Sequence, residues 1–242
     1  MDNLPFFKVG EKTSYEFEPP DEKNKWKKLK KQLGSNWKYY DATTNPLVTN
    51  LNELGYRSNT VYPVKNYYLA LGCSTTFGQY LHEQDMYSNI IEKHTNTPVI
   101  NLGISGASPM VIFANIAKLF YSDYPKPKKV FIQWPEQNRF TTFTDESNGY
   151  RPRLITPQIP EEDVFKFLIK GNSLETMAKF CYEMTHAICN VPIIEFAVWN
   201  QVAEFFNVTE IGRVDKARDH MHCGTETNKK MADFILGKIY DG

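Results

Sequence analysis

Short apolar runs that alternate with helix-length segments are the feature of this sequence that most restricts its fold. Four such runs read as buried strands: Tyr67–Leu71, Pro98–Leu102, Val130–Trp134 and Val191–Trp199. The segments between them are long enough to hold the crossover helices that parallel strands require. This alternation predicts a parallel sheet with helices on both faces, and 242 residues are enough for one large α/β domain of that kind.

Helical periodicity marks the segments between and after the predicted strands. The expected helices are Asp85–His94, Pro109–Phe120, one that runs from a capping box at Asn172–Glu175 to about Cys189, and Thr225–Tyr240. Pro109 suits the first turn of its helix, because that turn leaves the N–H that proline lacks unpaired. In the last helix Met231, Ile235 and Ile239 recur at every fourth residue and therefore line one face.

The first 64 residues differ in composition from the rest of the chain. They are rich in lysine, asparagine, acidic residues and proline, and they show no sustained apolar period. We expect residues 1–64 to form an N-terminal arm that packs on the main domain, with one short helix near Lys23–Leu33. Residues 65–242 are expected to form that domain.

The charge balance argues against a general affinity for nucleic acid or for an anionic membrane. Lysine plus arginine and aspartate plus glutamate both number 28. The basic run from Lys23 to Lys31 reads as the solvated face of a short helix. No signal-peptide pattern opens the sequence, and no stretch approaches about 18 consecutive apolar residues, so no membrane span is expected. Four cysteines without a close-set framework are typical of a reducing compartment.

Glycine-rich and polar segments follow three of the predicted strands, at Gly72–Ser74, Gly103–Gly106 and Pro135–Arg139. Ligands bind at the carboxyl ends of the strands in open parallel sheets, so these segments are expected to border a binding site. The stretch Phe140–Pro160 contains several prolines and little periodicity. A loop of that length inside a compact domain predicts a cover over the site.

Ser74 is a candidate nucleophile, because it follows a buried strand on a turn of small residues from which its hydroxyl can project. A serine nucleophile needs a base within hydrogen-bond reach and a third group that orients the base. Asp219 and His222 lie three residues apart near the C-terminus. On a turn or helix, this spacing lets the carboxylate bond one imidazole nitrogen and leaves the other as the base. His220, beside this pair, is a competing histidine.

Each candidate also has a purely structural interpretation. Ser74 could be a turn or N-cap serine, and Asp219 could be a helix-start aspartate beside an unrelated surface histidine. Gly106 follows the second predicted strand, where its N–H can face a developing negative charge, as a donor of an oxyanion hole does. The same glycine could serve only the backbone geometry of a helix entry. Taken singly, the residues leave these alternatives open.

The sequence from about residue 65 to the C-terminus resembles the SGNH/GDSL hydrolase superfamily. Gly72–Gly78 is similar to the first block of the family, Asn101–Gly106 to the second, and Asp219–His222 to the final Asp-x-x-His block. The resemblance implies a flavodoxin-like, three-layer α/β/α fold. It also implies that Ser74 is the nucleophile and one oxyanion donor, and that Gly106 is a second donor. Asp219 and His222 would be the acid and the base of the triad.

Two positions depart from the family's pattern. Cys73 stands where the family usually has aspartate, so the chain resembles a phage- or bacterial-type variant with a Gly-Cys-Ser first block. Asn52–Ser58 resembles a segment that precedes the first block in some phage and bacterial relatives, which indicates that the arm belongs to the domain. In the third block the oxyanion asparagine maps to Gln137, with Asn138 beside it. Loss of one such donor lowers kcat by about 10²–10³-fold, so this departure bears on efficiency.

The resemblance implies a serine esterase that hydrolyses a small acyl ester through an acyl-enzyme, with an O-acetyl group on a glycan as the favoured substrate. Two alternatives remain: a catalytically impaired module that binds glycan or has a structural role, and an acyltransferase that uses the same triad. No cofactor or metal is expected, because the histidines and cysteines lack the usual Cys-x-x-Cys or His-x-x-x-His spacing. We expect a cytoplasmic protein, or a virion component if the chain comes from a phage. The oligomeric state stays open.

Overall fold

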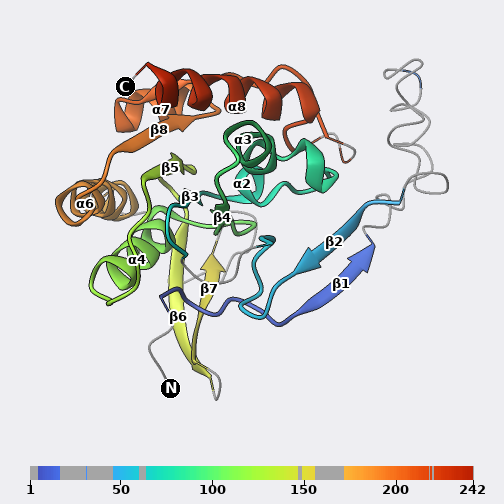
Figure 1. Ribbon diagram of the computed structural model, residues 1–242. Helices are drawn as coiled ribbons and strands as arrows, with labels where there is room; N and C mark the ends of the chain where they lie inside the picture. The colour runs from blue at the N-terminus through green and yellow to red at the C-terminus, as the bar shows by residue number, and fades with distance from the viewer. Residues whose placement is uncertain are drawn as a thin grey trace.

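A five-stranded, all-parallel sheet forms the centre of the protein (Figure 1). The computed structural model describes residues 5–16, 31, 46–59, 64–146, 149–155, 172–217, 219 and 221–241. In spatial order the strands are β4 (Val99–Asn101), β3 (Tyr68–Leu71), β5 (Lys129–Gln133), β8 (Ile193–Ala197) and β9 (Thr209–Glu210). Counted along the chain, this is the order 2-1-3-4-5 of flavodoxin-like sheets. The predicted parallel sheet is confirmed.

Helices cover both faces of this sheet. They are α2 (Ser74–Phe77), α3 (Tyr87–Thr95), α4 (Pro109–Phe120), α6 (Ser173–Ile188), α7 (Asn200–Phe206) and α8 (Thr225–Tyr240), and the 3₁₀ helix η2 (Glu83–Asp85) precedes α3. Figure 1 shows α3 and α8 on one side of the sheet and α4 and α6 on the other. The predicted α/β/α layering is therefore confirmed.

Strand β3 shows how the sheet supplies both hydrophobic cores. Successive residues of a strand point to opposite faces. Leu69 and Leu71 are buried in a cluster with side chains of α4, α6 and α7. Tyr68 and Ala70 belong to a second cluster, with side chains of α3 and α8. A strand with apolar residues on both faces is what a central position between two helical layers requires.

The helices that the sequence predicted are present, with differences at their starts. Helices α4 and α8 have the predicted ends, and Pro109 lies in the first turn of α4. Helix α3 begins at Tyr87 rather than Asp85, because the preceding residues form the 3₁₀ turn η2. The capping box predicted at the start of α6 is wrong. Asn172 has a left-handed backbone (φ 58°, ψ 24°) and its side chain makes no capping bond, whereas a side-chain cap needs an extended backbone at that position.

The predicted cover loop is instead a β-hairpin over most of its length. Strands β6 (Phe140–Glu146) and β7 (Gly149–Ile155) pair antiparallel, from Phe140 with Ile155 to Glu146 with Gly149. The prolines of this segment argued against strands, but Pro152 lies in a two-stranded sheet, where a strand has a free edge and proline is tolerated. Residues 156–160 lie outside the described ranges.

Parts of the N-terminal 64 residues contact α4, one of the helices that cover the main sheet. Strands β1 (Thr13–Glu16) and β2 (Val48–Leu51) form a separate antiparallel pair. Phe6 and Tyr56 are fully buried, and the Phe7 N–H and the Tyr56 hydroxyl both donate to Oδ1 of Asn115 on α4, at 3.2 and 3.4 Å. The helix expected near Lys23–Leu33 lies outside the described residues apart from Lys31. Within the described ranges, no helix is both long enough and apolar enough to cross a bilayer.

Candidate active site

Ser74 begins α2, directly beyond the carboxyl end of β3. The strand order of the sheet reverses between β3 and β5, and ligands of flavodoxin-like sheets bind in the crevice beyond the strand ends at that reversal. Gly72 makes the tight turn possible, since a Cβ there would lie 2.1 Å from Oγ1 of Thr76. The fold therefore places the Ser74 hydroxyl at the edge of the sheet where the chemistry was expected.

The second glycine-rich segment rests on the first. The amide nitrogen of Asn101 donates to the carbonyl of Thr76 at 2.7 Å, and its amide oxygen accepts the N–H of Gly103 at 2.8 Å. The N–H of Ile104 donates to the carbonyl of Gly72 at 3.1 Å. Gly106 has a φ of 77°, in the left-handed region where glycine avoids strain. Asn101 thus ties the loop that carries Gly106 to the helix that carries Ser74.

Two backbone N–H groups of this region lack an acceptor among the described residues. The first residues of a helix have N–H groups without an intrahelical partner, and Ser74 is such a residue. In the part of the chain that the structure describes, no acceptor engages the N–H of Ser74 or that of Gly106. Unpaired N–H groups of this kind can stabilise a developing oxyanion.

Asp219 and His222 form a hydrogen-bonded pair. Oδ2 of Asp219 lies 2.5 Å from Nδ1 of His222, and its Oδ1 accepts the backbone N–H groups of Met221 and His222 at 3.1 and 3.0 Å. Burial alone raises the pKa of Asp219, but the hydrogen bond and charge of His222, together with these N–H donors, outweigh it, so the pKa lies below its ordinary value. A carboxylate at this place favours the tautomer of His222 with the proton on Nδ1, in which Nε2 is the nitrogen that can accept a proton.

Two contacts bring the Asp219–His222 segment against the Ser74 helix. Thr75, next to Ser74, places its hydroxyl 3.8 Å from Sγ of Cys223, which is next to His222. The ring of Tyr80, just beyond α2, lies 5.9 Å from the imidazole of His222 at an interplanar angle of 30°. The first and last motifs of the sequence are therefore neighbours in space. His220, the competing histidine, lies outside the described residues.

Gln137, to which the oxyanion asparagine of the third block maps, takes part in none of the contacts described above. It lies in the turn after β5, half-buried, with Asn138 exposed beside it. This turn is closed by an ion pair between Glu136 and Arg139 and by a hydrogen bond from the Arg139 N–H to the Glu136 carbonyl at 3.3 Å. Within the described residues, no hydrogen bond links Gln137 to the Ser74 turn.

A residue that the sequence reasoning missed bonds to Cys73, the neighbour of the candidate nucleophile Ser74. Gln133, the last residue of β5, is buried, and its amide oxygen accepts the N–H of Cys73 at 3.2 Å. A signal was present in the sequence, because Gln133 is the one polar residue in the run Val130–Trp134. Among the described side chains, no three of the histidines, cysteines and acidic residues cluster as a metal ion would require.

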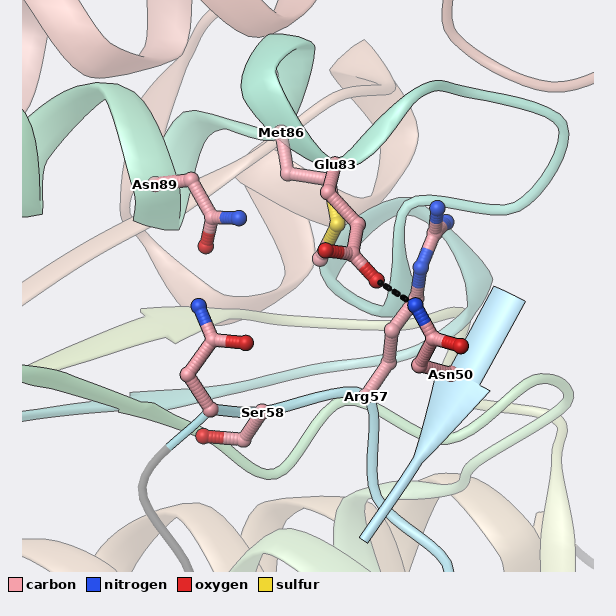
Figure 2. A pocket seen from close by; sticks show the side chains of 7 residues that line it. Asn50, Arg57, Ser58, Glu83, Met86 and Asn89 are labelled. Carbon is pink, nitrogen blue, oxygen red and sulfur yellow. Dashed lines mark hydrogen bonds between the residues drawn. The ribbon is translucent and has the colours of Figure 1, made fainter. Parts of the chain in front are cut away.

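A small polar hollow lies between β2, η2 and the start of α3 (Figure 2). It is lined by Asn50, Arg57, Ser58, Asn59, Glu83, Met86 and Asn89, and it shares no residue with the candidate site. Asn50 donates to Glu83 across it at 3.1 Å. The buried guanidinium of Arg57 donates to the carbonyls of Gly78 and Leu81, at 2.5 and 2.7 Å. Arg57 thus supports the chain that follows α2, on the way from Ser74 to Tyr80.

The close approach of Gly103 to α2 yields a testable prediction. A Cβ at Gly103 would lie 2.3 Å from the backbone nitrogen of Phe77, which cannot yield without moving α2. Gly103→Ala is therefore expected to lower the free energy of unfolding by about 2–3 kcal/mol, measured by urea denaturation. Gly237→Ala is the matched control, because a Cβ within α8 would meet nothing within 4 Å. The control should be stabilised by about 0.5–1 kcal/mol, and equal effects of the two changes would contradict the prediction.

Solved structures share this fold, and 35 chains match significantly. A carbohydrate esterase, whose active site is described as displaying divergent catalytic and non-catalytic binding functions, is 12% identical, with a TM-score of 0.51 over 82% of this chain and 77% of its own. A lipolytic G-D-S-L family member from Veillonella parvula is 12% identical, with a TM-score of 0.44 over 70% and 96% of the two chains. A catalytic mutant of an acetylxylan esterase from Geobacillus stearothermophilus is 13% identical, with a TM-score of 0.44 over 73% and 95%. No protein-family model and no curated protein matches the sequence.

The carbohydrate esterase and this chain share one fold, a parallel sheet between helical layers, which is the architecture that the sequence predicted. At these identities the similarity concerns the fold.

Proposed function

We propose that this protein is a serine esterase that removes small acyl groups, and in particular O-acetyl groups of glycans. The observation that carries the proposal is the short hydrogen bond between Asp219 and His222, at 2.5 Å, on a segment that contacts the Ser74 helix. A carboxylate that orients an imidazole is the arrangement that activates a serine hydroxyl once that hydroxyl is within hydrogen-bond reach of the imidazole.

In the proposed reaction, Oγ of Ser74 attacks the ester carbonyl and its proton passes to Nε2 of His222. The tetrahedral oxyanion is held by the N–H groups of Ser74 and Gly106, and the side-chain amide of Gln137 completes the oxyanion hole once substrate is bound. The intermediate collapses to an acyl-enzyme as the alcohol leaves with the proton from His222. A water molecule, deprotonated by the same imidazole, then attacks the acyl-enzyme and releases the acid.

The preference for a small acyl group on a glycan has a separate basis. The family resemblance favours it, and a carbohydrate esterase with this fold gives a reason to test glycan-linked acetyl groups. The residues 1–64 that contact α4, and the β6–β7 hairpin, lie outside the family's three motifs. Of the two, the β6–β7 hairpin, which follows the turn after β5, is the segment in which the glycan part of the ester would be recognised.

Acetyl release is expected from p-nitrophenyl acetate and from acetylated xylooligosaccharides. If the site prefers small acyl groups, the kcat/KM for p-nitrophenyl decanoate should be at least about tenfold lower than for the acetate. This corresponds to a difference of about 1.4 kcal/mol in activation free energy. The measurement is the initial rate of acid release, with and without an added alcohol.

The same assay separates the alternatives. Acyl capture by the alcohol in place of acid release would identify an acyltransferase. Saturable binding of the oligosaccharide, without turnover that depends on Ser74, would contradict the esterase proposal and identify a glycan-binding module. A faster reaction with the decanoate would contradict the assignment of a small acyl group.

A further inference from the structure

Gln133 connects the end of β5 to the residue that precedes the candidate nucleophile. It is 3% exposed and is the last residue of β5, directly after the buried apolar residues Val130–Ile132. β5 is paired with β3 up to Ile132 and Leu71, so that the next residues, Gln133 and Gly72, lie side by side. A Cβ at Gly72 would lie only 3.0 Å from the Cβ of Gln133. Because residue 72 has no side chain, the side chain of Gln133 can reach the turn that carries Cys73 and Ser74.

The hydrogen bonds of Gln133 define one orientation of its amide. Oε1 accepts both the N–H and the thiol of Cys73, at 3.2 and 3.1 Å. Nε2 donates to the carbonyl of Trp134 at 2.8 Å. A flipped amide would turn its NH₂ toward the N–H of Cys73 and its oxygen toward the carbonyl of Trp134, which are two repulsive contacts. The neighbouring backbone therefore dictates which atom faces Cys73.

Cys73 transmits this constraint to Ser74. It is the N-cap residue of α2 and makes no side-chain capping bond of its own. Its Sγ lies 4.0 Å from Oγ of Ser74. Because Gln133 fixes both the N–H and the thiol of Cys73, it also restricts the peptide that leads into Ser74 and the direction of the Ser74 N–H. A shift of about 1 Å at a reacting group can lower a rate by about 10²-fold.

We propose that Gln133 is the positioning residue of the nucleophile and that it is matched to Cys73. In this chain Cys73 stands where the resembled family usually has aspartate. A thiol donates a hydrogen bond to Oε1 of Gln133. An ionised carboxylate at the same place would be repelled by Oε1, because the bond from Nε2 to Trp134 keeps that oxygen facing residue 73. This inference rests on the proposed esterase function, since it assigns a role in that same site.

The test compares kcat and KM for p-nitrophenyl acetate in four variants and one control. Gln133→Leu removes the acceptor and is expected to lower kcat by about 10- to 100-fold with KM within about twofold, because the loss concerns alignment rather than binding. Cys73→Asp should lower kcat comparably. Cys73→Ser keeps a donor, and its kcat should stay at least about tenfold above that of Cys73→Asp. Asn115→Leu removes a buried amide on α4 and should lower the Tm without lowering kcat.

Gln133→Glu adds a readout that a purely structural role would not change. The protonated acid can donate to Trp134 and accept from Cys73, as glutamine does, whereas the ionised form cannot donate. Burial raises the pKa of a carboxyl group. The kcat of this variant relative to the wild type should therefore fall as pH rises through a new ionisation that the wild type lacks.

Three results would overturn the inference: a folded Gln133→Leu with wild-type kcat, a loss of kcat matched by Asn115→Leu, or equal kcat in Cys73→Ser and Cys73→Asp. If Gln133→Leu does not fold, the two Cys73 variants decide. If the wild type shows no turnover that depends on Ser74, the proposed function has failed, and amide hydrogen exchange decides the inference. Exchange at Cys73 should then be at least about tenfold faster in Gln133→Leu or Gln133→Glu than in the wild type, and unchanged exchange would overturn it.

Discussion

Ser74→Ala is expected to lower kcat/KM for p-nitrophenyl acetate by at least about 10³-fold, to the level that the remaining site provides without a nucleophile. The change removes the atom that forms the acyl-enzyme. It should hardly affect stability, because within the described ranges the Ser74 hydroxyl has only a long contact, 4.0 Å, to Sγ of Cys73. The measurement is steady-state hydrolysis, with the Tm and the circular dichroism spectrum as controls of folding.

His222→Ala provides the matched test, because the serine and the base act as a unit. The double variant should be no slower than either single variant, as is found for groups that share one step. A fluorophosphonate should label the wild type at Ser74 and should not label Ser74→Ala. Full activity in Ser74→Ala would mean that the nucleophile is another residue, and the proposed function would then lose its site.

Asp219→Asn is expected to lower kcat by about 10⁴-fold while the backbone geometry persists. An asparagine oxygen can still accept the N–H groups of Met221 and His222, which the carboxylate now accepts at 3.1 and 3.0 Å. The amide NH₂ would instead face Nδ1 of His222 and favour the tautomer that carries the proton on Nε2. That tautomer cannot take the proton of Ser74, so kcat should fall far more than KM changes. A decrease of less than about tenfold would contradict the role of Asp219 as the triad acid.

The lowered pKa of Asp219 also predicts how stability depends on pH. A carboxyl whose pKa is lower in the folded than in the unfolded state stabilises the fold above its unfolded pKa, which is about 3.9. That contribution disappears as pH falls through the folded-state pKa. The difference in the free energy of unfolding between the wild type and Asp219→Asn should therefore be constant at neutral pH and shrink below about pH 4. Urea denaturation between pH 3 and pH 7 tests this, and a difference that does not change with pH would contradict it.

Local sequence patterns were sufficient for much of the architecture. Helices α4 and α8 have the predicted ends, since their apolar periodicity and the proline at the start of α4 act within the helix itself. The parallel sheet followed from the alternation of strands and helices, which leaves few other ways to cover two apolar faces. β6 and β7 were missed because a strand at a free edge tolerates the proline that argued against it. Asn172 was misread because its backbone, rather than its residue type, decided whether it caps α6.

In the candidate site, too, some features follow from the local sequence and others from the tertiary structure. The sequence by itself determined that Asp219 and His222 can bond, because side chains three residues apart on a turn can meet without any distant contact, and the structure contains that bond. It also determined that a serine follows a buried strand at a turn of small residues. Only the tertiary structure decided that Thr75 meets Cys223 across 148 residues, since that contact depends on how α2 and the segment before α8 pack on one sheet edge. The same packing selected Gln133 as the partner of Cys73, because neighbouring parallel strands bring together residues that no local pattern relates.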